Sequence, residues 1–294
     1  MIIKNSRLIN CLLLSAVFIA SGCGLAKRLM MSSGTDTMNH LLSSVHAQPD
    51  PELVRQGLPA FIMLLDGLVH ADPDNPDLLR ATANAYVAYA QAFLSSEEDE
   101  GRAVKLYERA KGYGLQLLRR HDHFVEALDG DSDAYVAVLQ DFHQKDVPDL
   151  YTAATAWLGW IIANSDSVAA LADLSRAIAL MERVMELDEA YGGGAAHLTF
   201  GIYYSVQPAG AGQDLDKSRH HFERAITLAG AGDLTPRVLY AEFVGKAAMD
   251  EAFFTQQLEA ILDTDPADWP EKRLTNELAI QRARLLLINK DDYF

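Results

Sequence analysis

The sequence predicts an all-α fold in which helical hairpins stack into an array that a C-terminal capping helix closes. The stretch from Ala195 to Leu228 carries two runs of large apolar residues at helical spacing, joined over residues 208–216 by a turn of Pro, Gly and short polar residues. A similar spacing of small and large residues recurs elsewhere in the chain. No run of alternating apolar and polar residues indicates a sheet. These observations favour paired helices over any fold that contains strands.

The recurring register has a small residue, a large residue four positions later, and Ala or Val three positions after that. The copies are Glu100, Ala103, Tyr107 and Ala110; Leu174, Ala177, Met181 and Val184; and Leu215, Ser218, Phe222 and Ala225. Residues three and four apart share one face of a helix, so each set forms a packing face. Because one helix pair cannot bury such a face alone, copies stack. This face is typical of tetratricopeptide units, and we predict cryptic repeats of that type.

The first predicted helix starts at Pro51, because Pro is favoured in the first turn of a helix, and runs to Ala71. Residues 72–76, which contain Asp, Asn and Pro, stop this helix and cap the next. The helices predicted after it cover residues 78–94, a stretch from the cap at 95–98 to about 120, and residues 125–142. A segment that begins at Pro148 follows and holds two of the three Trp residues.

The second half continues with a repeat helix over residues 168–187 and a connector of three glycines, Gly192 to Gly194, before the hairpin. The later helices are predicted over residues 237–248, 250–262 and 274–289. The second of these keeps Phe254, Leu258 and Ile261 in register without the small residue, which makes it a degenerate copy. The last is more charged and suits the exposed end of an array.

The N-terminus predicts export and lipidation. Lys4 and Arg7 precede an apolar run over residues 11–20 that is too short to span a bilayer. The sequence Ala20-Ser21-Gly22-Cys23 resembles the bacterial lipobox, whose Cys becomes acylated. We therefore predict a signal peptide over residues 1–22, a lipidated tether over 23–37 and one helical domain over 38–294. The alternative is an ordinary secretory signal with an incidental Cys.

Charge and cysteine content agree with this interpretation. The chain carries 25 basic and 41 acidic residues, a formal charge of −16, which disfavours nucleic acid as a partner. Its two cysteines are Cys11, inside the signal peptide, and Cys23, the predicted lipid site, so no disulfide is expected. Gly24 follows Cys23 in place of Asp, and by resemblance to enterobacterial sorting this favours an outer-membrane lipoprotein that faces the periplasm and contacts the membrane through its lipid anchor only.

Six segments in a fixed order carry a resemblance to a known family. They are residues 57–61 with 65–67, the Ala- and Tyr-rich helix after 72–76, residues 157–160 with 163–166, residues 181–184 with 186–188, residues 194–198, and the terminal Asp-Asp-Tyr-Phe. They are similar to the T component associated with TRAP transporters, the TatT family of periplasmic lipoproteins. The resemblance extends from about Leu53 to Phe294, and the loop at 209–214 departs from it.

The resemblance implies a fold of cryptic tetratricopeptide-like hairpins, a homotrimer, and a channel through each protomer. It also implies a partner, the solute-binding (P) protein of a TRAP system. The T component of such a system is thought to assist the handling of an apolar or amphipathic ligand, such as an organic acid, in the periplasm.

No constellation of residues predicts catalysis, a metal or a cofactor. The pairs His121 and His123, and His220 and His221, lack a third ligand at helical spacing, and no His-Glu-x-x-His motif occurs. The glycines at 192–194 lack the strand and the Lys of a phosphate-binding loop. Runs of acidic residues such as 97–100 are explained as partners of the positive end of a helix dipole. We therefore expect a protein that is not an enzyme.

Aromatic residues on the two segments that flank the second repeat helix are the candidate ligand site. Amphipathic rings suit the wall of a cavity for an apolar ligand with a polar end, and two neighbouring polar residues could bind that end. The candidates are Tyr151, Trp157, Trp160, Tyr203 and Tyr204, with Asn164 and Ser165 as the polar residues. The alternative is packing of the same rings in a core between hairpins.

Two functions remain open on the sequence. The first is a binding component of a TRAP system, which contacts the P protein and possesses a ligand cavity. The second is a helical-repeat lipoprotein scaffold for envelope assembly that binds no small molecule. The fold alone does not separate them.

Overall fold

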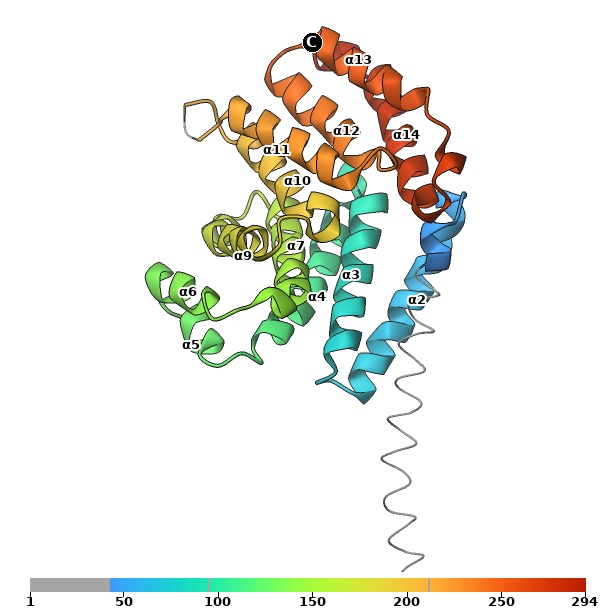
Figure 1. The fold of residues 1–294 in the computed structure, drawn as a ribbon. Coiled ribbons are helices and arrows are strands. Elements are labelled where there is room, and N and C mark those ends of the chain that lie inside the picture. Colours follow the sequence, from blue (N-terminus) through green and yellow to red (C-terminus); the bar gives the residue numbers. More distant parts are fainter. Residues whose placement is uncertain (1–42, 95, 211) are drawn as a thin grey trace, which may run out of the picture. The chain divides into compact units, whose positions relative to one another are not determined.

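The computed structural model describes residues 43–94, 96–210 and 212–294 (Figure 1). The chain divides into two compact units, Met1–His46 and Ala47–Phe294. Of the first unit only residues 43–46 are described, and they are helical. The predicted signal peptide, Cys23 and the tether lie outside the described residues, and the architecture below is that of the second unit.

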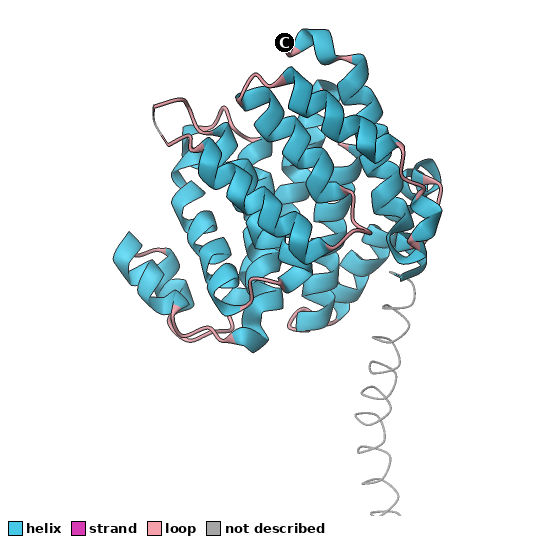
Figure 2. Cartoon of the chain, turned by 45° about the horizontal axis from the view of Figure 1, so that its top comes forward, coloured by secondary structure: helices cyan, strands magenta, loops and turns pink. Residues whose placement is uncertain are grey.

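Every regular element in the described part of the chain is helical and no strand occurs there (Figure 2), which confirms the all-α class. The first half contains α2 (Pro51–Ala71), α3 (Pro76–Phe93), α4 (Glu100–Leu118), α5 (Phe124–Leu128), α6 (Ser132–Leu139) and α7 (Val147–Ala163). The second half contains α8 (Val168–Ala172), α9 (Leu174–Leu187), α10 (Tyr191–Val206), α11 (Leu215–Ala229), α12 (Thr235–Tyr240), α13 (Glu251–Leu262) and α14 (Arg273–Ile288). None of these helices has the length and apolar character needed to cross a bilayer.

Acidic and amide side chains fix where several helices begin. The Asp50 carboxylate accepts hydrogen bonds from the backbone N–H groups of Glu52 and Leu53, at 2.9 and 3.2 Å, at the start of α2. Asn75, Asp214 and Asp250 cap α3, α11 and α13 in the same way. Each cap gives a partner to an N–H group that the first turn of a helix leaves unpaired. The helix starts expected near residues 51, 76 and 215 are therefore fixed by the capping side chain that precedes each helix.

Helices close in sequence pack side by side. α2 packs on α3, α3 on α4, α4 on α7, α7 on α9, and α10 on α11. α12 continues into a π-helical turn, Ala241–Gly245, and packs with α13 and α14 around a separate core. α14 also contacts α2, so the last helix of the array lies against the first (Figure 1). The succession of helix pairs fits the predicted hairpin array, whose repeat character stays a prediction.

The large residues of the predicted register are buried where helices come closest. A Cβ atom on Gly201 of α10 would lie 2.8 Å from the ring of Phe222 of α11, and one on Gly159 of α7 would lie 2.3 Å from the ring of Tyr107 of α4. Phe222 is fully buried and Tyr107 is 8% exposed. A ring on one helix thus occupies the space that a glycine leaves on its neighbour, which lets the two backbones approach closely.

Two stretches predicted as single helices are interrupted. Residues 125–142 form α5 and α6, separated at Gly130, because the Asp131 carboxylate accepts a hydrogen bond from the N–H of Ala134 at 2.8 Å and starts a new helix. Residues 168–187 form α8 and α9, separated at Asp173. The Asp173 carboxylate bonds to side chains of α4 and α7 and not to its own helix. At Asp173 a polar contact overrides the apolar periodicity, whereas residues 129–133 of the first break are Asp-Gly-Asp-Ser-Asp and carry no apolar residue.

Candidate functional site

Trp157 and Trp160 of α7 lie beside a half-buried charge pair, Lys111 and Asp173. The indole N–H of Trp157 donates to Oδ2 of Asp173 at 3.0 Å, and Nζ of Lys111 from α4 donates to the same oxygen at 3.1 Å. The Lys111 ammonium also lies 3.7 Å from the ring centroid of Trp160 and 4.9 Å from that of Trp157. A cation over an indole ring is stabilised by the ring quadrupole. These four side chains, from α4, α7 and the α8–α9 break, form one group.

Tyr151 lies near the other end of α7 and contacts different residues. Its ring packs edge-on against Tyr191 with centroids 5.3 Å apart. Burial, with a further contribution from Tyr191, raises the pKa of Tyr151 to about 12. The pKa of Tyr191 is also raised, chiefly by burial. The Tyr151 hydroxyl is therefore neutral at physiological pH.

Tyr203 and Tyr204 lie near the end of α10, and Tyr204 contacts α11. Their rings contact each other at 5.3 Å, and Tyr204 stacks on His221 at 5.7 Å with an angle of 18° between the planes. The Lys217 ammonium lies 5.2 Å from the centroid of Tyr204. This group is thus held within the α10–α11 hairpin.

The two predicted polar residues follow α7 in a turn. Asn164 is half-buried and donates its backbone N–H to the carbonyl of Ile161, whereas Ser165 is exposed. The five aromatic candidates share one core: Trp157 belongs to it with 2% exposure, and Tyr151, Trp160, Tyr203 and Tyr204 pack against it. These contacts are those of core packing, and a ligand-lining role of the seven residues stays a prediction.

The structure also joins two histidines that the sequence does not show to be neighbours. Nδ1 of His197 in α10 lies 2.9 Å from Nδ1 of His221 in α11, and Nε2 of His197 lies 3.3 Å from Oε2 of Glu189. A neutral His197 that donates from Nε2 to Glu189 accepts the Nδ1–H of His221. Arg224 also pairs with Glu189. Burial first, then the neighbouring His197, His220 and Lys217, lowers the pKa of His221 to about 4.

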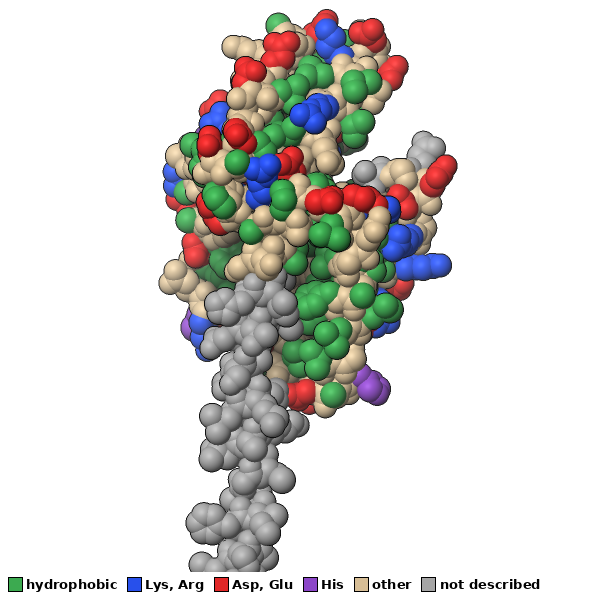
Figure 3. Space-filling model, turned by 90° about the vertical axis from the view of Figure 1, so that its right-hand side faces the viewer, with side chains coloured by type: hydrophobic (Ala, Val, Ile, Leu, Met, Phe, Trp, Pro, Cys, Tyr) green, Lys and Arg blue, Asp and Glu red, His purple; other side chains and the backbone are tan. Residues whose placement is uncertain are grey.

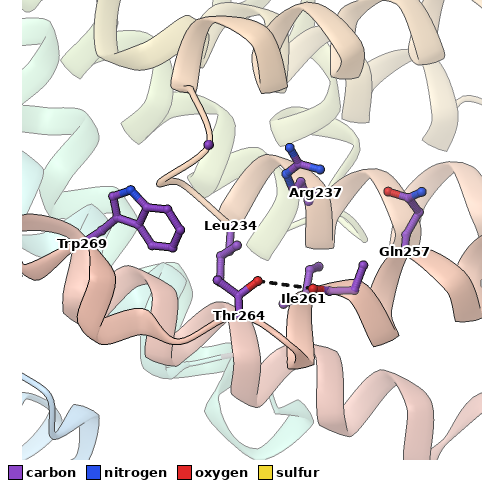
Figure 4. Close-up of a pocket in the computed structure, with 8 residues that line it drawn as sticks. Leu234, Arg237, Gln257, Ile261, Thr264 and Trp269 are labelled. Atoms are coloured by element: carbon purple, nitrogen blue, oxygen red, sulfur yellow. Dashed lines mark hydrogen bonds between the residues drawn. The ribbon is translucent and has the colours of Figure 1, made fainter.

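A cleft of about 180 Å³ lies between α12 and α13 (Figure 4). Figure 4 shows Arg237 and Gln257 on one side of it and Trp269 on the other, with Leu234, Ile261 and Thr264 between them. The sequence interpretation missed this cleft, because its residues are divided among the turn before α12, α12 itself, the degenerate copy and the turn after it. Within the part of the chain that the structure describes, no group of three or more His, Cys, Asp or Glu side chains is placed to hold a metal ion.

An apolar surface lies along α2 (Figure 3). Leu53, Met63 and Leu64 are 55%, 68% and 58% exposed. Small residues share this exposed side, and a Cβ atom on Gly57 or Gly67 would meet no other atom within 4 Å. An exposed apolar strip of this kind is typical of a surface that contacts another protein.

The comparisons with known proteins agree with the resemblance seen in the sequence. A chain described as an uncharacterized protein of Treponema pallidum (strain Nichols) is 27% identical over 314 aligned positions, which cover 97% of each chain. The family model for the TRAP transporter T-component matches residues 47–294, the whole of the helical unit. This chain therefore belongs to the TRAP transporter T-component family and is an accessory component of that transport system in the cell envelope.

Proposed function

We propose that this T component is a lipoprotein, anchored through Cys23 in the outer membrane, that binds the solute-binding (P) protein of a TRAP system in the periplasm. The observation that carries the proposal is the family match, which spans the whole helical unit. The lipobox-like residues before Cys23 support the anchor. Several acyl chains on one residue would give stable membrane attachment, which a single chain does not.

The proposal includes an apolar or amphipathic organic acid as ligand, bound at the aromatic residues predicted from the sequence. The group of Trp157, Trp160 and Lys111 supports this part, because it combines indole surface with a cation that could attract a carboxylate. A ligand there would compete with Asp173 for the Lys111 ammonium. The protein would act by binding and transfer, without a chemical reaction of its own.

A pull-down from envelope extract tests the proposal. The bait is the soluble form that begins at Gly24, and both the proteins and the small molecules that co-purify are identified by mass spectrometry. We expect a periplasmic solute-binding protein and an organic acid in the eluate. A matched bait with Trp160→Ala should retain the protein and recover less of the acid than the unaltered bait. Recovery of outer-membrane assembly factors alone would contradict the proposal and favour the scaffold.

A further inference from the structure

The cleft between α12 and α13 has an apolar floor. Leu234 and Ile261 are 3% and 1% exposed. Its volume of about 180 Å³ is below the roughly 300–1,000 Å³ that drug-sized ligands occupy. A short organic molecule fits this size.

The lining of the cleft is positively charged, although the protein as a whole is acidic. Arg237 is its one charged lining residue, and no carboxylate of the described residues lies within ion-pair distance of this guanidinium. The nearest acid in the sequence, Asp233, is paired with Lys272 at 2.8 Å. With 41 acidic and 25 basic residues in the chain, an arginine without a carboxylate partner leaves a planar donor group available to an anion.

The wall of the cleft is fixed by buried contacts. Asn276 of α14 is fully buried; its Nδ2 donates to the carbonyl of Gly232 at 3.0 Å, and its Oδ1 accepts from the N–H of Leu234 at 3.1 Å. The indole of Trp269 covers Gly232 so closely that a Cβ atom there would lie 2.3 Å from Cδ1 of the ring. The loop and the ring are therefore held in place without a ligand, and a pre-formed cleft binds at a lower entropic cost.

We propose that this cleft binds a small carboxylic acid with a short, unbranched apolar chain. The carboxylate takes the side of Arg237, where the Gln257 amide is a second donor, and the chain lies over Leu234 and Ile261 toward the ring of Trp269 (Figure 4). The site shares no residue with the aromatic candidates of α7 and α10. A test of this site is therefore independent of a test of the proposed transport function.

The test is a binding titration of the full-length chain, purified in detergent, with acetate, butyrate and hexanoate. We expect affinity to rise about fourfold per methylene group as the chain fills the apolar floor. Arg237→Gln should weaken all three acids at least about tenfold, because a hydrogen-bonded charge is lost. Arg284→Gln is the matched control, since Arg284 is exposed and also lacks an ion pair with the described residues, and it should bind as the unaltered chain does.

A second variant separates the two halves of the site. Gly232→Ala displaces the indole of Trp269 and should remove the higher affinity for hexanoate than for acetate. Adding Arg237→Gln to this variant should still weaken the binding of both acids. Hexanol should bind at least about tenfold more weakly than hexanoate. Equal binding of hexanol and hexanoate, or hexanoate binding that Arg237→Gln leaves unchanged, would overturn the proposal. The titration contains no P protein, so a negative result in it is distinguishable from a negative result in the pull-down.

Discussion

His197 and His221 form a titratable pair inside the α10–α11 hairpin. The 2.9 Å distance between their Nδ1 atoms requires one ring to donate and the other to accept, which two protonated rings cannot do. Positive charge from Lys217 and His220 faces His221, and Glu189 faces His197 from the side away from the pair. The pair therefore favours the neutral form of His221.

This predicts that the protein loses stability as the pH falls below about 6.5. The pKa of His221 is 6.5 when unperturbed and about 4 in the fold, so between these values the unfolded chain binds more protons than the folded chain. The free energy of unfolding therefore decreases as the pH is lowered. Each kcal/mol lost lowers the unfolding midpoint by about 2–4 °C. Thermal unfolding at pH 7.5, 6.5 and 5.5 measures the effect. His221→Gln should flatten the pH dependence, and an equal slope in that variant and in His220→Gln would refute the assignment.

At the level of single residues, the sequence was a partial guide. It indicated the α7 tryptophans as candidates for a cavity wall, with core packing as the alternative; Trp157 belongs to one core and Trp160 packs against it. It did not indicate the contact of His197 with His221, which lies 24 positions away. Nor did it indicate the contacts of Lys111 with Trp157 of α7 and with Asp173 in the α8–α9 break. Such contacts are set by the angle and register between helices, which one sequence does not specify.

At the level of elements, close contact of α10 and α11 depends on Gly201. A methyl group there would lie 2.8 Å from the Phe222 ring, which is fully buried and cannot move without disturbing the core. Gly201→Ala should therefore destabilise the protein by about 1–3 kcal/mol. Gly112→Ala is the matched control, because Gly112 is an exposed position in α4 with nothing within 4 Å, and Ala there should stabilise by about 0.5–1 kcal/mol. Urea unfolding measures both, and equal effects would contradict this packing account.

The helices themselves were largely predictable from periodicity and caps. The starts of α2, α3 and α11 follow from Asp or Asn followed by Pro or Leu, and the spacing in α4, α9 and α11 gave their buried faces. The breaks at Gly130 and Asp173 were missed. Apolar spacing continues through the break at Asp173, whereas residues 129–133 are Asp-Gly-Asp-Ser-Asp, a cap signal that the interpretation did not use. Both breaks involve hydrogen bonds that compete with the helix.

At the level of the whole molecule, the exposed apolar row of α2 suits contact with a second copy of the chain. Leu53, Gly57, Ala60, Leu64 and Gly67 follow one another at spacings of four, three, four and three, the pattern of a helix that packs along another helix. The predicted homotrimer would cover this row. Leu64→Glu should shift the molar mass measured by light scattering toward the monomer, whereas Lys105→Glu, at an exposed position of α4 away from this row, should not. A monomeric unaltered chain would contradict the prediction.

The function proposed for this T component depends on its binding a solute-binding protein. The most direct measurement is sedimentation of the purified chain mixed with the P protein recovered in the pull-down, at increasing concentrations of that protein. We expect a faster-sedimenting complex that saturates at a fixed ratio of the two chains and that also forms with Trp160→Ala. Two independent boundaries at all concentrations would contradict it.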